Sequence, residues 1–205
     1  MNARNRLFVI SAPSGAGKTS LVRALMEKEP QLRFSVSYTT RPQRPGEHHG
    51  QHYFFVAPED FERMAAHGAF LEHARVFDNH YGTARAQVEA LLAEGHGVVL
   101  EIDWQGARQV RAAMPESVGI FILPPSRAEL ERRLRGRATD SETVIRRRLA
   151  DAAADMSHWS EFDFVVVNDD FATALQALVD IVRGRGEASR SDRPELAPVV
   201  AALLA

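Results

Sequence analysis

The sequence contains no cysteine and no long hydrophobic run. Without cysteine, the chain can form no disulfide, no thiolate metal site and no cysteine nucleophile, which fits the reducing cytoplasm. The apolar run Leu7 to Ile10 is too short for a signal peptide or a membrane span. The net charge of -2 combines 25 basic with 27 acidic side chains, so no bulk field favours nucleic acid or a membrane. We expect a cytoplasmic protein, either a monomer or a homo-oligomer, whose partners must be identified from local sites.

The hydrophobic pattern predicts an α/β fold. With 205 residues, 45% of them hydrophobic, the chain can bury the core of one domain. Strands alternate with helices in the outer parts of the chain, which is typical of a doubly wound parallel sheet. The stretches 34–83 and 127–156 break this pattern and are expected to be insertions beside the sheet. We assign the core to residues 1–33, 84–126 and 157–186, and a tail to residues 187–205.

The boundaries of the expected elements follow from periodicity and from proline and glycine positions. The expected strands are 6–11, 34–38, 52–56, 97–103, 119–123 and 164–168, with a further alternating stretch at 70–77. The expected helices are 18–29, 58–67, 84–94, 105–114, 126–135, 141–158 and 172–183, with Asp140 or Ser141 capping the sixth. The end of the chain, 184–205, is rich in arginine, serine and proline, and we expect it to be mobile or to bind a partner.

A glycine-rich loop follows the first expected strand and opens the first helix. Its sequence is Ala12-Pro13-Ser14-Gly15-Ala16-Gly17-Lys18-Thr19. This context is typical of a P-loop, whose backbone N–H groups bind phosphate, although the first position has alanine where the general pattern has glycine. We expect Lys18 to contact the β- and γ-phosphates of ATP and Thr19 to bind Mg²⁺. Lys18 is one of only two lysines in the chain, whose basic residues are otherwise arginine. This choice indicates that the position requires a compact charge, and it argues against the alternative of an ordinary turn with an exposed lysine.

Two arginines stand three positions apart in a proline-rich loop. Arg41 and Arg44 lie in the segment Thr40-Arg41-Pro42-Gln43-Arg44-Pro45-Gly46-Glu47. Two guanidinium groups so spaced could hold a dianionic phosphate. Paired surface arginines are more often simply solvated, so this interpretation depends on the rest of the sequence.

Several further motifs occur in a fixed order along the chain. They are His-Tyr-Phe-Phe, Phe-Leu-Glu-His, Tyr-Gly-Thr, Asp-Trp-Gln-Gly-Ala and Asn-Asp-Asp, and they follow the phosphate loop and the arginine loop. Together these motifs resemble the guanylate kinase family over residues 6 to 183. The resemblance implies a P-loop NTPase-type core with a GMP-binding lobe at 34–83 and a lid at 127–156. It implies Mg²⁺-dependent transfer of the γ-phosphoryl group of ATP to GMP, giving ADP and GDP.

The resemblance also implies roles for individual residues. Arg41, Arg44, Tyr53 and Tyr81 match the ligands of the GMP phosphate, and Ser37, Glu72 and Thr83 match the residues that bind guanine. A carboxylate such as Glu72 would complement the adjacent N1–H and amino donors of guanine. In the lid, Arg137 and Arg148 match the arginines that contact the triphosphate. Asn168 matches an adenine contact, with a turn-forming asparagine as the alternative.

Two carboxylates end the strand expected at 97–103. Glu101 and Asp103 stand where parallel sheets place ligand-binding groups, and either could organise the waters of Mg²⁺ or orient the acceptor arginines. Related sequences usually have aspartate at the first of these positions, so we place more weight on Asp103. Four other arginines of the 127–156 stretch are expected to be solvated, namely Arg132, Arg133, Arg146 and Arg147.

Two other functions share the same fold. A related kinase could phosphorylate a sugar phosphate, but such an acceptor would leave Glu72, Ser37 and Thr83 without a guanine to bind. A guanylate kinase-like scaffolding module would bind peptides and would have lost ATP binding. The intact Lys18 and Thr19 argue against that alternative.

Overall fold

The computed structural model describes residues 5–76, 78–136 and 142–204. Its core is a sheet of five strands in the order β2-β7-β1-β8-β9, with parallel pairing throughout. The strands are β1 (Leu7–Ser11), β2 (Leu32–Phe34), β7 (Gly97–Glu101), β8 (Val118–Leu123) and β9 (Phe164–Val167). The parallel-sheet core expected from the alternating pattern is confirmed.

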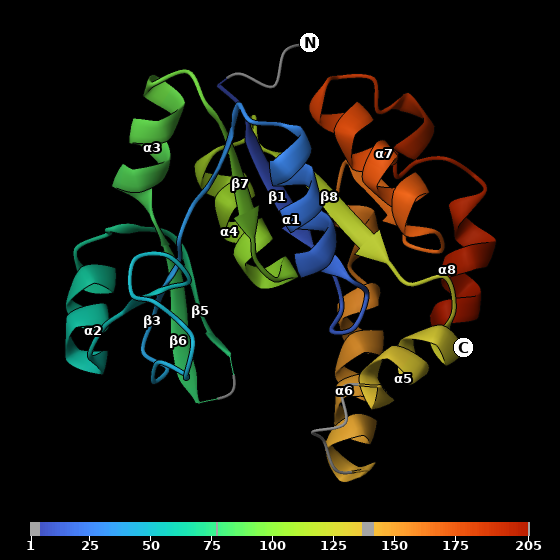
Figure 1. Ribbon diagram of the computed structural model, residues 1–205, viewed down its shortest axis with the longest axis horizontal. Helices are drawn as coiled ribbons and strands as arrows, with labels where there is room; N and C mark the ends of the chain where they lie inside the picture. Colours follow the sequence, from blue (N-terminus) through green and yellow to red (C-terminus); the bar gives the residue numbers. More distant parts are fainter. Residues whose placement is uncertain (1–4, 77, 137–141, 205) are drawn as a thin grey trace.

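Helices cover both faces of this sheet (Figure 1). They are α1 (Lys18–Lys28) and α7 (Phe171–Val182) on one face, and α3 (Arg85–Ala93) and α4 (Trp104–Ala113) on the other. The central strand β1 contributes side chains to the apolar layers on both faces of the sheet. Phe8 and Ile10 pack with α1 and α7. Leu7 and Val9 pack with α3 and α4. The alternating side-chain directions of a strand explain this division. The phosphate loop therefore leaves a strand that is buried on both faces.

A second, smaller sheet forms the inserted lobe beside the core (Figure 1). Its strands run in the order β4-β3-β6-β5, and one helix accompanies them. They are β3 (Tyr38–Thr39), β4 (Phe54–Phe55), β5 (Phe70–Val76) and β6 (Asn79–Ala84), with α2 (Pro58–Ala66). We call residues 34–83 the acceptor lobe, although Phe34 itself ends the core strand β2.

The single strand expected at 34–38 is wrong, because this segment is divided between the two sheets. Phe34 ends β2 in the core, and the N–H of Ser35 still donates to the carbonyl of Val99 at 3.2 Å. Tyr38 then begins β3, next to Gly82 of β6. The apolar alternation is continuous across this crossing, which is why the sequence pattern concealed it.

Three helices form the other side of the molecule. They are α5 (Arg127–Arg135), α6 (Glu142–Met156) and α8 (Leu196–Leu204), and we call residues 127–156 the lid. The expectation of a mobile tail is wrong for α8, because Leu196, Val200 and Leu203 are buried against residues of α5 and α6. Their spacing of three and four positions makes one apolar helical stripe. The alternative, that the tail binds a partner, stays a prediction. The expected cap residues Asp140 and Ser141 lie outside the described residues.

Within the described part of the chain, no helix has both the length and the apolar character needed to cross a membrane.

Candidate active site

The phosphate loop has a backbone that requires glycine. Gly15 and Gly17 have φ angles of +91° and +94°, a region that residues with a Cβ rarely enter. At Gly15 a Cβ would lie 2.9 Å from Leu130 of α5, and at Gly17 it would collide with the amide of Asn168. Helix α1 begins at Lys18, directly after Gly17, so the free N–H groups of its first turn face the glycine-rich part of the loop. This arrangement is suited to binding phosphate.

Two side chains support the loop from behind. Asn168 is buried, and its Nδ2 donates to the carbonyl of Ala16 at 2.7 Å. Arg133 donates from Nη1 to the same carbonyl at 3.4 Å and from Nη2 to the carbonyl of Asn168 at 3.1 Å. Glu129 accepts from Nε of Arg133 at 2.7 Å and so fixes its orientation. The expectation that Arg133 is solvated is wrong, because it spans from the lid to the phosphate loop.

Lys18 and Thr19 point toward the end of β7. The hydroxyl of Thr19 donates to Oε1 of Glu101 at 2.6 Å, and Nζ of Lys18 lies 3.9 Å from the same oxygen. Burial lowers the pKa of Lys18, while Glu101, Asp103 and Asp155 act against this shift. Neighbouring carboxylates favour the ammonium form, which is the form that contacts phosphates.

The two carboxylates at the end of β7, Glu101 and Asp103, have different surroundings. Oδ1 of Asp103 accepts from the N–H of Gly106 at 2.8 Å, so Asp103 is the N-cap of α4. Glu101, by contrast, contacts Thr19 at the phosphate loop. Glu101 is the carboxylate that contacts the loop, and the greater weight on Asp103 near Mg²⁺ stays a prediction. The longer side chain of glutamate reaches Thr19 from the last position of the strand.

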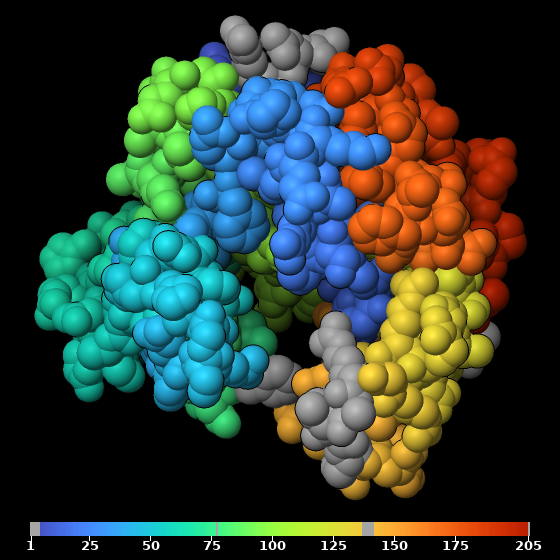
Figure 2. Space-filling model, viewed as in Figure 1, coloured from blue at the N-terminus to red at the C-terminus, as the bar shows by residue number. Residues whose placement is uncertain are grey.

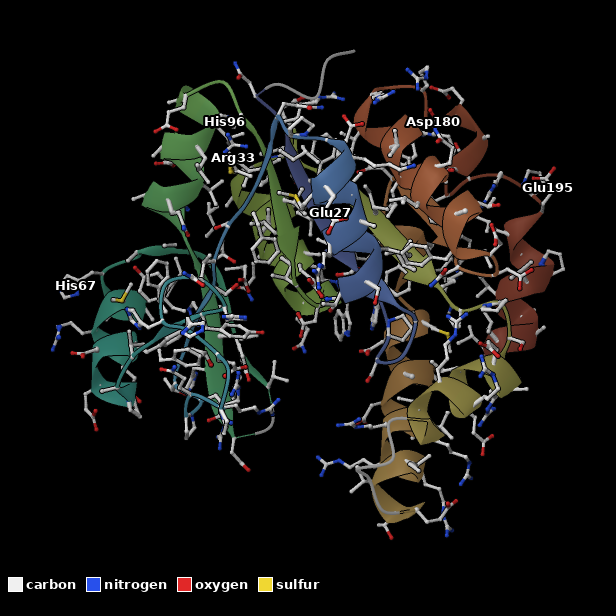
Figure 3. All side chains as sticks on the ribbon, in the orientation of Figure 1. Glu27, Arg33, His67, His96, Asp180 and Glu195 are labelled. Carbon is white, nitrogen blue, oxygen red and sulfur yellow. The ribbon has the colours of Figure 1, made fainter. Side chains whose placement is uncertain are left out.

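A cavity of about 870 Å³ separates the phosphate loop from the acceptor lobe. Figure 2 shows the surface hollowed between this lobe and the lid. Glu27 on α1, labelled in Figure 3, lines the cavity on the side of the core. The core contributes Lys18, Thr19, Glu101 and Asp103, and the lobe contributes Ser37, Tyr53, Glu72 and Tyr81. Residues expected to bind the two nucleotides thus line one space.

Glu72 lies deep in this cavity with 4% of its surface exposed. The hydroxyl of Thr83, on the neighbouring strand, donates to its Oε1 at 2.6 Å. Burial raises the pKa of Glu72 to about 7, which exceeds the opposing effect of the Thr83 hydrogen bond. A buried carboxylate with open acceptor positions is suited to a ligand that offers adjacent N–H donors.

The arginine loop contains a carboxylate whose role the sequence analysis did not identify. Glu47 accepts from Nη2 of Arg41 at 2.7 Å and from the backbone N–H of Arg44 at 2.8 Å. The hydrogen bond from Arg41 lowers the pKa of Glu47 to about 2. The guanidinium of Arg41 lies 5.4 Å from the centre of the Tyr53 ring, and Tyr53 packs edge-on against Tyr81. Arg44 is exposed.

The base of the lid meets the core at Trp104. Its indole stacks on His158 with 3.6 Å between ring centres, and its Nε1 donates to Asp155 at 3.2 Å. Burial raises the pKa of Asp155 to about 6, with Asp103 adding to the shift. Sequence reasoning did not identify this junction. Of the two expected lid arginines, Arg148 is half-buried on α6 and Arg137 lies outside the described residues.

A phosphate loop and a buried carboxylate that open onto one cavity are the features expected of a P-loop phosphotransferase. The guanylate kinase family model matches residues 4–185. The chain is 59% identical over 198 residues to a guanylate kinase of Methylococcus capsulatus, covering 97% of each chain, and 56% identical over 183 residues to that of Escherichia coli K12, covering 88% of each. A solved guanylate kinase from Anaplasma phagocytophilum is 36% identical, with a TM-score of 0.73 over 91% of this chain and 88% of its own. The chain belongs to the guanylate kinase family, as its motifs predicted.

Proposed function

We propose a residue-level account of how this member of the guanylate kinase family transfers the γ-phosphoryl group of ATP to GMP, giving ADP and GDP. One observation carries the account: the phosphate loop and the buried Glu72 open onto the same cavity. Direct transfer requires the two nucleotides to meet end to end with the reacting phosphates aligned. A single space between the loop and the acceptor lobe allows this arrangement.

The donor site is the phosphate loop. Residues Ala12 to Thr19 bind the phosphates of ATP through backbone N–H groups and through the ammonium group of Lys18. Asn168 and Arg133 hold the loop in shape through the carbonyl of Ala16. We therefore assign Asn168 a supporting role at the ATP site, in addition to any contact with adenine.

The residues near the loop fit Mg²⁺. The adjacent hydroxyl of Thr19 and carboxylate of Glu101 are hard oxygen ligands, and Mg²⁺ in such enzymes is held by one or two protein groups together with phosphates and waters. Thr19 would bind the ion directly, and Glu101 and Asp103 would accept hydrogen bonds from its waters. When bound, the ion neutralises charge on the transferring phosphates.

The acceptor site lies across the cavity. Arg41, Arg44, Tyr53 and Tyr81 bind the phosphate of GMP, with Glu47 holding Arg41 and the backbone of Arg44 in place. Burial raises the pKa of the Tyr53 phenol above its usual value, so its hydroxyl stays protonated and can donate.

Guanine is bound at the inner end of the acceptor site. Ionised Glu72 accepts hydrogen bonds from the two adjacent donors of the base, and Ser37 and Thr83 complete the pocket. Adenine has no N1–H donor and carries its amino group at a different position, so it leaves the buried carboxylate unpaired. Mismatches of this kind can reduce the specificity constant by roughly 10⁴.

Phosphoryl transfer then needs no covalent enzyme intermediate. A phosphate oxygen of GMP forms the new bond to the γ-phosphorus as the bond to the β–γ bridging oxygen breaks, and that oxygen leaves with ADP. Lys18 and Arg41, together with Arg137 and Arg148 of the lid, stabilise charge on the transferring group, as arginines do in related reactions. Closure of the lid excludes water.

A coupled assay of ADP formation tests the account. With ATP and Mg²⁺ present, GMP should turn over while AMP, CMP and UMP should not, and Glu72→Ala and Lys18→Ala should each abolish turnover. Activity on a sugar phosphate instead of GMP would favour the related kinase. A folded protein that binds neither ATP nor GMP would favour the scaffolding module. The cytoplasmic location and the oligomeric state stay predictions from the sequence.

A further inference from the structure

The acceptor-lobe strand β5 is held by a core helix at the residue after Glu72. The N–H of His73 donates to Oε1 of Gln109 at 3.1 Å, and Nε2 of Gln109 donates to the carbonyl of His73 at 3.0 Å. Gln109 belongs to α4, so both polar atoms of one side chain bind the backbone of one residue in another part of the fold. A paired contact of this kind fixes the position and the direction of the strand.

The strand needs this support because its ladder is irregular there. Phe70 pairs with Ala84, whereas Glu72 pairs with Thr83, so the register of β5 against β6 shifts between these positions. Shifts of this type change the direction in which a side chain points. The ladder alone therefore does not define where the Glu72 carboxylate lies, and the contact from Gln109 supplies an additional constraint.

Helix α4 approaches the same carboxylate through a glycine. A Cβ at Gly106 would lie 2.7 Å from Oε2 of Glu72 and 3.2 Å from its Cδ. Gly106 has no positive φ and lies within the helix, where glycine is less favourable than alanine. Backbone conformation thus gives no reason for glycine, whereas the approach of the carboxylate does.

We propose that Gly106 and Gln109 are positioning residues for guanine selectivity, which hold the Glu72 carboxylate where it can accept both donors of the base. The inference rests on the proposed function. Thr83 donates to Oε1, and Gly106 leaves space for Oε2. A methyl group at position 106 displaces the flexible end of Glu72 by several tenths of an ångström while leaving the helix able to form.

The test compares two acceptors that differ at one donor. GMP has the exocyclic amino group of guanine, and IMP lacks it, so the ratio of their kcat/KM values reports the contact of that group with Glu72. Gly106→Ala and Gln109→Ala should each reduce this ratio about tenfold or more, because small displacements of an oriented group have large effects. The KM for ATP should stay unchanged. Gln176→Ala is the matched control, since Gln176 is also exposed on a helix and bonds only Asp180 among the described contacts.

The possible outcomes separate the two proposals. If the wild-type protein phosphorylates neither GMP nor IMP, the proposed function is wrong. If the wild-type protein prefers GMP and both folded variants keep its GMP to IMP ratio, the function stands and the positioning role is wrong. Equal losses on GMP and IMP with a raised KM for ATP would show a general structural effect and would also overturn the inference. If Gly106→Ala does not fold, Gln109→Ala decides the question, because it introduces no new atom.

Discussion

Replacing Glu72 by glutamine should stabilise the protein at high pH while removing its activity. Burial raises the pKa of Glu72 from 4.5 to about 7, so the folded state binds a proton more tightly than the unfolded state. This group therefore makes the wild-type protein less stable as pH rises from about 4.5 to about 7. At pH 8 the ionised carboxylate costs roughly 3 kcal/mol, at about 1.36 kcal/mol per pKa unit.

Glutamine removes this cost and can still accept the hydrogen bond from Thr83. Its new N–H donors lie near Gly106, and an unsatisfied donor costs about 1–3 kcal/mol. We expect a net gain of about 1–2 kcal/mol at pH 8 and no gain at pH 5, where the wild-type side chain is already neutral.

Urea denaturation of both proteins between pH 5 and pH 8.5 measures the effect. The difference in unfolding free energy should grow up to about pH 7 and then level off, following the pKa of Glu72. GMP turnover by the variant should be lost throughout. Glu47→Gln is a useful comparison, because the pKa of Glu47 is lowered to about 2 by Arg41, so that variant should be destabilised. A stability difference for Glu72→Gln that does not change with pH would refute the reasoning.

Three further predictions concern ligand binding and packing. Arg133→Ala should weaken binding of a nonhydrolysable ATP analogue about tenfold, as measured by titration calorimetry, because the Ala16 carbonyl loses one of its donors. An equal effect of Arg132→Ala, at a more exposed arginine, would contradict this prediction. Leu203→Ala should lower the free energy of unfolding in denaturant by about 2–5 kcal/mol. Leu204→Ala, at its exposed neighbour, should lower it by less than about 0.5 kcal/mol. Equal small effects would mean that the packing of α8 contributes nothing to stability. From pH 8 to pH 6, the affinity for GMP should fall about tenfold as Glu72 takes up a proton, while the affinity for the ATP analogue should show no matching fall. Equal GMP affinities at both pH values would contradict the role of the ionised carboxylate.

The core and the outline of the donor site could be predicted from the sequence. The phosphate loop could be identified because an apolar strand precedes Ala12 and a helix follows Gly17. Both elements can be predicted from the pattern of neighbouring residues alone. The acceptor residues followed from motifs in a fixed order. Lys18 and Glu72 line the same cavity, and their roles at the donor and acceptor sites stay predictions.

Other features depend on contacts between distant segments, which periodicity does not encode. In the sequence, Arg133 is one of several charged residues on a predicted helix. Its contact partner Ala16 lies 117 positions away in the chain. The burial of α8 depends on the lid helices that cover it. The contact of Glu101 with Thr19 depends on the reach of the glutamate side chain, which position along the strand does not encode.

The junction at the base of the lid has an experimental consequence. The chain has two tryptophans, and Trp104 stacks on His158 while Trp159 follows directly in the chain and packs in the same apolar cluster as α6. Both tryptophans therefore lie where the lid joins the core. Stopped-flow emission of the unlabelled protein should follow movement at this junction in real time, without any dye or engineered residue.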